Sequence, residues 1–262
     1  MIQLQIELSG MVGIVTGVGK GIGKEIIMTL AREGVKTIGV DVNQEDLDQL
    51  SQEFSEEGLD GLFFNCDVRD SKMITEVVNK TIKEYGRVDL LVNNAGVAGN
   101  GEVETLPEEI WDFCHDVNLK GMYLMCKAVI PIMKRQQFGR IINSASFAAI
   151  IPSIGSAAYA SSKAGVKQFS RVLAGELGPW NITVNSYAAG MIPTTLNHFS
   201  ELPQEQQDRL LDSLTLRRWG EKKDIAQLIC FLASDLAGYI TGTLIDVSGG
   251  KYATQFPKAA YE

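Results

Sequence analysis

The sequence predicts a doubly wound, Rossmann-like α/β fold, in which helices cover both faces of one parallel seven-stranded sheet. Short apolar runs alternate with longer helix-periodic stretches along the chain, as in folds built from β-α-β units. A glycine-rich turn joins the first apolar run to the first helix-like stretch. The 262 residues are 45 % hydrophobic and contain no linker, internal repeat or low-complexity stretch, so we expect one domain over residues 1–262.

The apolar runs define the seven expected strands. They cover residues 11–16, 36–40, 63–66, 88–92, 141–145, 182–185 and 244–247. The stretches between them have lengths suited to crossover helices, so the strands should be parallel. Ligands of such sheets bind beyond the carboxyl ends of the strands. The polar residues that follow these ends should therefore gather in one crevice; they include Asp41, Asp67, Asn93 and Ser146.

The first strand runs into the turn GVGKGIG at residues 17–23, and a helix is expected over residues 24–33. Backbone N–H groups of such a turn, together with the helix N-terminus, face a phosphate. The spacing excludes a P-loop, which needs glycine where Val18 stands and Ser or Thr where Glu25 stands. It also excludes the common G-x-G-x-x-G pattern; the spacing G-x-x-x-G-x-G fits. A flexible turn is the alternative for this loop taken alone.

The second strand ends at Asp41, twenty residues after Gly21. A carboxylate there is placed to hydrogen-bond the ribose of adenosine and to repel a 2′-phosphate, which favours NAD over NADP. Lys20, a base within the glycine turn, argues weakly for a phosphate. The alternative for Asp41 is a cap on the helix expected from near Gln44.

Tyr159 and Lys163 are four residues apart in a small-residue run that enters a helix-periodic stretch. At this spacing both side chains lie on one helical face. An ammonium about 4 Å from a phenolate, at an effective dielectric near 20, is worth roughly 4 kcal/mol, or about three pKa units. The phenol would then titrate near neutrality, where an acid/base catalyst is useful. The alternative is a surface tyrosine packed on a lysine stem.

These segments together resemble the short-chain dehydrogenase/reductase family, in its shorter branch. The resemblance runs nearly end to end, and the order and spacing agree throughout. It rests on Thr16-Gly17-x-x-x-Gly21-Ile22-Gly23, Asn93-Asn94-Ala95-Gly96, Asn118, Ser146, Tyr159-x-x-x-Lys163 and Ile192-x-Thr194.

The resemblance implies four catalytic residues. Tyr159 would exchange a proton with the substrate oxygen, Lys163 would lower the pKa of Tyr159, and Ser146 would hold that oxygen. Asn118 would position a water leading to Lys163, although a helix-kinking amide is its alternative. Hydride would move directly between the nicotinamide and the substrate carbon, so no metal is expected.

The resemblance also implies a cofactor cleft in which Asp67 bonds the adenine amine and Val68 packs on the ring. Ile192 and Thr194 would meet the nicotinamide carboxamide and the diphosphate. The full expected cofactor-binding set is Gly17, Lys20, Gly21, Ile22, Gly23, Asp41, Asp67, Val68, Asn94, Ala95, Gly96, Tyr159, Lys163, Gly190, Ile192 and Thr194.

One position departs from the family, which usually has Pro-Gly where this chain has Ala189-Gly190. The pocket beside it is expected to differ in shape. A lid should span about residues 191–214, and apolar residues there and after Ser146 predict a fairly apolar substrate. Tyr187 and Met191 should complete the pocket.

Composition and charge argue against several kinds of partner and binding site. A net charge of −8 argues against nucleic acid or anionic membranes as partners. No apolar stretch is long enough for a membrane span, and the N-terminus lacks the pattern of a signal peptide. Four scattered cysteines without a C-x-x-C pair indicate reduced thiols in the cytoplasm. Two histidines, His115 and His198, are too few for a histidine-rich metal site.

The sequence therefore predicts an NAD-dependent oxidoreductase that interconverts a secondary alcohol and a ketone. The family's 3-oxoacyl-[acyl-carrier-protein] reductases, which usually use NADPH, are the main alternative. A non-catalytic dinucleotide sensor is a remote one, because such a module would not need Ser146, Tyr159 and Lys163 together. The family also implies a homotetramer formed through helices near residues 121–134 and 159–178, with the C-terminal tail reaching a neighbour.

Overall fold

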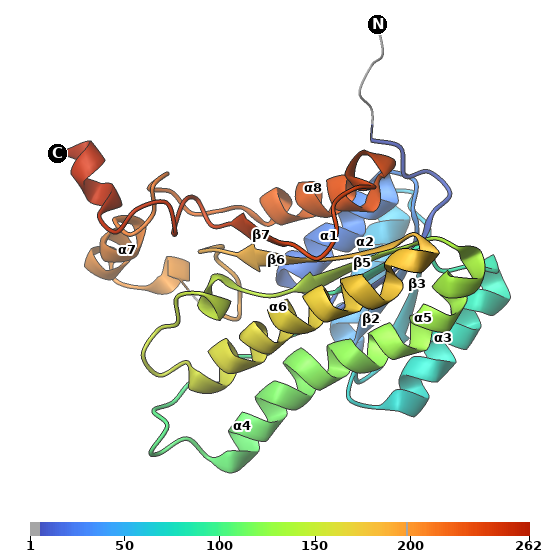
Figure 1. The fold of residues 1–262 in the computed structure, drawn as a ribbon, viewed down its shortest axis with the longest axis horizontal. Helices are drawn as coiled ribbons and strands as arrows, with labels where there is room; N and C mark the ends of the chain where they lie inside the picture. Colours follow the sequence, from blue (N-terminus) through green and yellow to red (C-terminus); the bar gives the residue numbers. More distant parts are fainter. Residues whose placement is uncertain (1–5, 198) are drawn as a thin grey trace, which may run out of the picture.

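Seven parallel strands form the central sheet in the computed structural model, which describes residues 6–197 and 199–262. The strands are β1 (Val12–Thr16), β2 (Lys36–Asp41), β3 (Gly61–Asn65), β4 (Leu90–Asn93), β5 (Gly139–Ser144), β6 (Ile182–Ala189) and β7 (Leu244–Val247). Their order across the sheet is β3-β2-β1-β4-β5-β6-β7 (Figure 1). The chain winds outward from β1 to β3 and then returns to place β4 on the other side of β1. This switch point is where such sheets bind ligands.

Helices cover both faces of the sheet (Figure 1). They are α1 (Gly21–Arg32), α2 (Gln44–Glu56), α3 (Ser71–Tyr85), α4 (Glu108–His115), α5 (Met122–Gln136), α6 (Ala157–Leu177), α7 (Gln204–Leu211) and α8 (Lys222–Ala233). Neighbouring residues of β1 point to opposite faces. Ile14 packs in a cluster with residues of α3, α5 and α6, whereas Val15 packs with residues of α1, α2 and α8. The predicted doubly wound, seven-stranded, single-domain fold is confirmed.

Most strand boundaries differ from the predicted ones by one to four residues, and the first helix also begins at another residue than predicted. The first helix begins inside the glycine turn at Gly21, three residues before the predicted start. β3 runs from Gly61 to Asn65 rather than over residues 63–66, because Gly61 pairs with Thr37 of β2. β6 continues past residue 185 to Ala189, which pairs with Val247 of β7. Pairing between strands, which a single run of residues does not reveal, set the last two boundaries.

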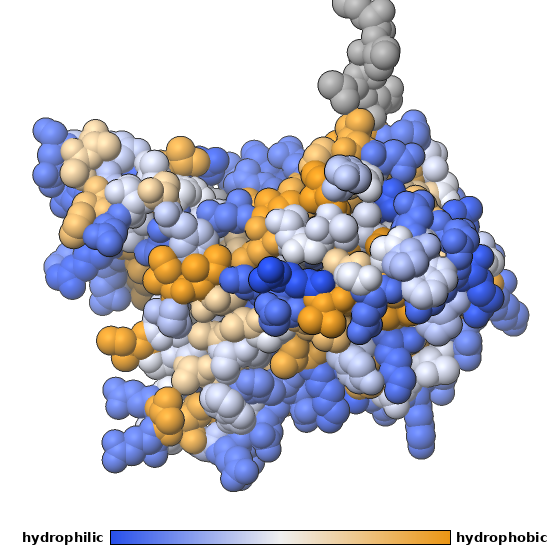
Figure 2. Space-filling view, viewed as in Figure 1, coloured by the Kyte–Doolittle hydropathy of each residue, from blue (hydrophilic) through white to orange (hydrophobic). Residues whose placement is uncertain are grey.

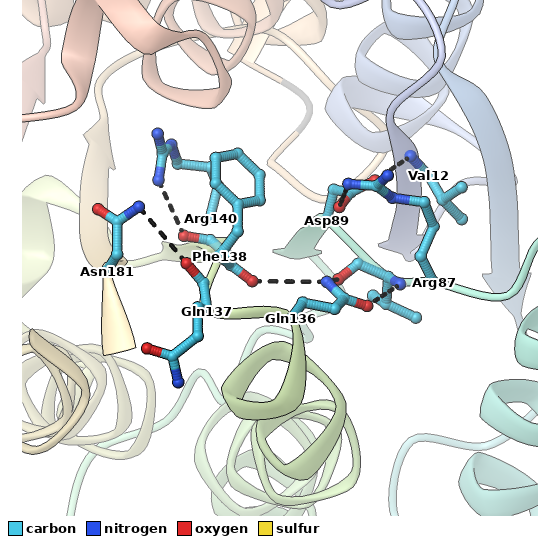
Figure 3. A network of polar contacts seen from close by, with 10 residues as sticks. Val12, Arg87, Asp89, Gln136, Gln137, Phe138, Arg140 and Asn181 are labelled. Atoms are coloured by element: carbon cyan, nitrogen blue, oxygen red, sulfur yellow. Dashed lines mark hydrogen bonds and ion pairs between the residues drawn. The ribbon is translucent and has the colours of Figure 1, made fainter. Parts of the chain in front are cut away.

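A polar network closes the amino-terminal edge of the sheet (Figure 3). The fully buried Asp89 accepts the backbone N–H of Val12 at 2.9 Å and is paired with Arg87. Gln136 accepts the N–H of Val88 at 2.9 Å and donates to its carbonyl at 2.8 Å. These bonds satisfy backbone groups at strand starts and leave the opposite, carboxyl edge free for the site.

Helix α6, at 21 residues, is the longest of the described helices. Within residues 6–197 and 199–262, no helix combines the length and the apolar character needed to cross a bilayer.

Candidate active site

Close backbone packing shapes the glycine turn between β1 and α1. Gly17 has a left-handed φ of +71°, and a Cβ there would lie 2.8 Å from the Cα of Ala95. A Cβ on Gly23 would lie only 1.9 Å from the carbonyl oxygen of Gly17. Glycine at both positions lets the turn fold tightly onto the helix start, so its N–H groups can cradle a phosphate. The residues present fit a dinucleotide at this turn.

Asn94, one of the expected cofactor residues, ties three strands together behind this turn. Its Nδ2 donates to the carbonyls of Thr16 and Gly17 at 3.1 Å each, and its Oδ1 accepts the Tyr187 hydroxyl at 3.1 Å. Thr16 Oγ1 in turn accepts the N–H groups of Asn94 and Ala95. Tyr187 was predicted to line the substrate pocket, and that prediction is wrong: the side chain is fully buried in the core. Thr16 belongs to the motif quoted above, but no role had been predicted for its side chain.

Asp41 ends β2 beside the glycine turn, as expected. Its Oδ2 accepts the N–H of Gly19 at 2.8 Å and its Oδ1 accepts that of Asn43 at 3.1 Å. The alternative in which Asp41 caps α2 is wrong, because Asn43 is the N-cap and accepts the N–H of Asp46. Lys20 reaches α2, where its Nζ lies 3.0 Å from Asp46 Oδ1.

Asp67 and Val68 follow β3 at the same edge. The Asp67 carboxylate is already engaged by Arg69, whose Nε donates to Oδ2 at 2.9 Å, and this pair holds the pKa of Asp67 below its usual value. The expected bond from Asp67 to an adenine amine would therefore share the carboxylate with Arg69. Val68 is buried against Gly121, where a Cβ would lie 2.7 Å from Val68 Cγ2.

Lys163 and Tyr159 lie one turn apart on α6, as predicted. Lys163 is buried, its Nζ donates to the carbonyl of Ser144 at 2.7 Å, and it lies 5.7 Å from the centre of the Tyr159 ring. A Cβ on Gly96 would lie 3.4 Å from this Nζ, so the lysine faces the Asn94–Gly96 side of the cleft. Burial lowers the pKa of Lys163 from 10.5 to about 8.

The pKa of Tyr159 is raised above its ordinary value in this structure, whereas the Tyr-x-x-x-Lys spacing predicted that it would be lowered. Desolvation raises the pKa of Tyr159, and a hydrogen bond with Ser146 only partly opposes this. The predicted shift assumed a charge in direct contact with the phenol. Here burial of the two groups disfavours the charged form of each, the lysine ammonium and the phenolate. The Ser146 hydroxyl also accepts the N–H of Ala148, which orients it.

Asn118 lies in a π-helical segment (Asp116–Gly121) between α4 and α5. Its Oδ1 accepts the N–H of Val97 at 2.8 Å, and its Nδ2 donates to the Val97 carbonyl and to Ser162 Oγ, both at 3.0 Å. The side chain therefore joins the loop after β4 to α6, and it sits where the helix widens. Such widened turns are frequent at functional sites.

The predicted lid contains a short 3₁₀ turn (Phe199–Glu201) and α7. Thr194 Cγ2 would lie 3.8 Å from a Cβ on Gly21, so the start of the lid covers the glycine turn. Gly190 packs on the residue that follows β7, since a Cβ on it would lie 2.4 Å from Ser248 Cα. A cavity of about 560 Å³ opens beneath α7, with Phe199, Leu202 and Leu210 among its lining residues.

The sequence predicts no metal site. In the part of the chain that the structure describes, no three His, Cys, Asp or Glu side chains are grouped to hold a metal ion. His115 bonds the Trp111 carbonyl and Ser161, and His198 lies outside the described residues.

A family model described as enoyl-(acyl carrier protein) reductase matches residues 17–251, which is most of the chain. A relative in Thermotoga maritima, the 3-oxoacyl-[acyl-carrier-protein] reductase FabG, is 39 % identical over 247 residues, covering 94 % of this chain and 99 % of the relative. The chain is a short-chain dehydrogenase/reductase.

Solved structures of other short-chain dehydrogenase/reductases match over almost the whole fold. Levodione reductase has a TM-score of 0.89 and 31 % identity, covering 94 % of this chain and 99 % of that one. An NAD⁺-bound xylitol dehydrogenase has a TM-score of 0.89 and 28 % identity, covering 93 % of this chain and 100 % of that one. This short-chain dehydrogenase/reductase is thus an oxidoreductase that resembles enzymes with quite different substrates.

Proposed function

We propose that this protein is an NAD-dependent dehydrogenase that interconverts a secondary alcohol and a ketone on a small, fairly apolar substrate. The observation that carries the proposal is the grouping of Ser146, Tyr159 and Lys163 beside the glycine turn. Ser146 bonds Tyr159, and Lys163 faces Gly96 across the cleft. A module that only bound a dinucleotide would not require this set of reactive groups.

Each residue of the group has a distinct role in the proposal. Tyr159 donates a proton to the ketone oxygen, or takes it from the alcohol, and Ser146 holds that oxygen by a hydrogen bond. Lys163 supplies positive charge that favours the phenolate in the transition state. Asn118 holds the loop at Val97 against α6 and so keeps Lys163 in place. Bound nicotinamide supplies or accepts the hydride.

The proposed cofactor is NAD, and Asp41 is the main support. Its carboxylate lies at the end of β2 and is bound to Gly19 of the turn, where a 2′-phosphate would meet a negative charge. The similarity to an NAD⁺-bound xylitol dehydrogenase agrees with this assignment. Gly17, Gly21, Ile22 and Gly23 would hold the diphosphate, and Ile192 and Thr194 would close over it.

A second candidate is reduction of a 3-oxoacyl thioester with NADPH. It is favoured by the 39 % identity to a 3-oxoacyl-[acyl-carrier-protein] reductase. The net charge of −8 opposes an acidic carrier protein at long range, and Asp41 opposes NADPH. A survey of NAD⁺ and NADP⁺ reduction across sugars, polyols, diols, steroids and hydroxyacyl thioesters separates the two candidates. Turnover restricted to NADP⁺ and hydroxyacyl thioesters would establish the second.

Replacing Tyr159 by Phe tests the proposed chemistry. The variant keeps the ring but loses the proton donor, so we expect turnover to fall by at least about 10³-fold while the dissociation constant for NAD⁺ changes little. Steady-state kinetics and calorimetric titration of the same preparation measure both quantities. Turnover within ten-fold of the wild type would remove Tyr159 from its proposed role.

We also propose a cytoplasmic homotetramer. The four cysteines are buried and unpaired, as suits a reducing compartment. Apolar side chains on α4, α5 and α6 are exposed, among them Trp111, Tyr123 and Val172, and hydrophobic residues reach the surface over α5 and α6 (Figure 2). Neighbouring copies could bury these side chains.

A further inference from the structure

Carboxylates of α2 hold the basic side chains at the start of α1. Lys20 Nζ lies 3.0 Å from Asp46 Oδ1, and Lys24 Nζ lies 2.6 Å from Glu53. The Asp46 side chain is 15 % exposed, whereas that of Lys20 is 58 % exposed. Asp46 stands in the first turn of α2, where the helix dipole favours a carboxylate. The anion is therefore held in place by the fold, and the lysine reaches over to it.

Asp46 also borders the residue of the glycine turn that Asp41 binds. A Cβ built on Gly19 would lie 2.8 Å from Asp46 Cβ and 3.1 Å from Asp41 Oδ2. Two carboxylates, Asp41 and Asp46, thus flank the backbone of Gly19. The basic residue next to it, Lys20, is paired with one of them.

We propose that Asp46 is a second determinant of dinucleotide selectivity, which acts by positioning Lys20. The inference rests on the proposed preference for NAD. A 2′-phosphate is accommodated by a cation near the end of β2, and Lys20 is the basic residue of the turn beside Asp41. To serve a phosphate, Lys20 must leave Asp46.

Breaking that pair is unfavourable for NADP in two ways. It leaves the mostly buried Asp46 carboxylate without its partner, and the added phosphate then lies near both Asp41 and Asp46. NAD has no 2′-phosphate, so its binding leaves the Lys20–Asp46 pair intact. Asp46 therefore holds Lys20 away from a 2′-phosphate. A base that would otherwise favour NADP binding then contributes to the preference for NAD.

A double-mutant cycle on the two residues tests this. Dissociation constants for NAD⁺ and NADP⁺ are measured by calorimetry for the wild type, Asp46→Asn, Lys20→Met and the double variant. Freeing Lys20 should add a charge-assisted bond to the phosphate, so Asp46→Asn should tighten NADP⁺ relative to NAD⁺ by about ten-fold. Lys20→Met alone should hardly change the ratio, and the double variant should return most of the way to the wild-type ratio.

Asp48→Asn is the matched control, because Asp48 is an exposed carboxylate on the same helix that bonds Gln44. It should keep the wild-type ratio, since it removes the same charge away from the turn. Asp46→Ala repeats the test without an amide that can still hold Lys20. An unchanged ratio in both Asp46 variants, or an equal change in the presence of Lys20→Met, would overturn the proposal.

The same measurements distinguish this failure from failure of the proposed function. A wild-type protein that binds NADP⁺ more tightly than NAD⁺ contradicts the NAD assignment, whatever Asp46 does. The role of Asp46 is decided by the change in ratio between variants and not by which cofactor binds more tightly. Both conclusions follow from dissociation constants alone, without an activity assay.

Discussion

Lys163 places an ammonium group in a site where the residue is only 3 % exposed to solvent. One hydrogen bond, to the Ser144 carbonyl, offsets part of the lost hydration, and the pKa falls to about 8. A buried lysine of this kind destabilises the fold when it is charged. The lower stability of the fold arises at the residue that we propose to favour the Tyr159 phenolate. Such losses of stability are common at functional sites.

The depressed pKa of Lys163 predicts a pH dependence of stability. Between about pH 8 and pH 10.5 the unfolded chain binds the proton that the folded chain has released, so stability should rise with pH across this window. The full shift corresponds to about 3 kcal/mol. Urea unfolding at several pH values should show wild type gaining this amount relative to Lys163→Met from pH 8 to 10.5.

Lys163→Met isolates the lysine, because the other titrating groups are common to both proteins. Below pH 8 the difference in unfolding free energy between the two proteins should be constant. Parallel curves across the whole range would mean that the folded protein does not lower the pKa of this lysine.

At the scale of elements, the two edges of the sheet have different tasks. The carboxyl edge carries the glycine turn, Asp41, Ser146 and the lid, whereas the amino edge is closed by the Asp89 network in Figure 3. Asp89 accepts the N–H of Val12 and so joins the start of β4 to the start of β1. Because β1 and β4 flank the switch point, this bond supports the two strands from which the cofactor cleft is built.

Asp89→Ala should destabilise the protein by about 3 kcal/mol, because the buried N–H of Val12 then lacks an acceptor and Arg87 loses its partner. Denaturant unfolding measures the loss. The exposed Asp48 is the comparison, since Asp48→Ala should stay within about 0.5 kcal/mol of the wild type. Equal effects at the two positions would show that the network contributes little.

At the scale of the whole molecule, the exposed apolar side chains lie on helices that are adjacent in space. Tyr123 of α5 meets Phe169 of α6 edge-to-face with ring centres 6.3 Å apart, and Tyr123 and Val172 remain 42 % and 54 % exposed. A surface of this kind is typical of contacts between copies of a chain.

Tyr123→Glu should therefore weaken the proposed tetramer, because a charge would be buried between subunits. Light scattering coupled to size exclusion should give four times the chain mass for wild type and a smaller species for the variant. Val103→Glu, in the exposed loop before α4, should keep the wild-type mass. A monomeric wild-type protein would contradict the tetramer directly.

The expected C-terminal contact with a neighbour has a competing arrangement within the chain. Tyr261 donates to the Thr215 carbonyl at 2.7 Å, and Lys258 lies 3.2 Å from Asp212. The tail therefore packs on the segment that follows α7. These contacts could not be predicted from the local sequence, because the partners are more than forty positions apart.

The seven strands, their parallel arrangement, the glycine turn and the placement of the site at one edge could be predicted from the sequence, although most strand ends could not. These features follow from local periodicity, from glycine spacing and from the rule that parallel strands end at the same edge. The spacing of Tyr159 and Lys163 placed them on one helical face without any knowledge of their neighbours.

The contacts of those side chains could be known only from the folded chain. Lys20 pairs with Asp46, Lys163 with the Ser144 carbonyl, and Tyr187 with Asn94 in the core rather than in the pocket. Each partner lies on another element, so local sequence patterns cannot predict these contacts. Burial is likewise a property of the whole fold, and it is burial that raises the pKa of Tyr159 and lowers that of Lys163.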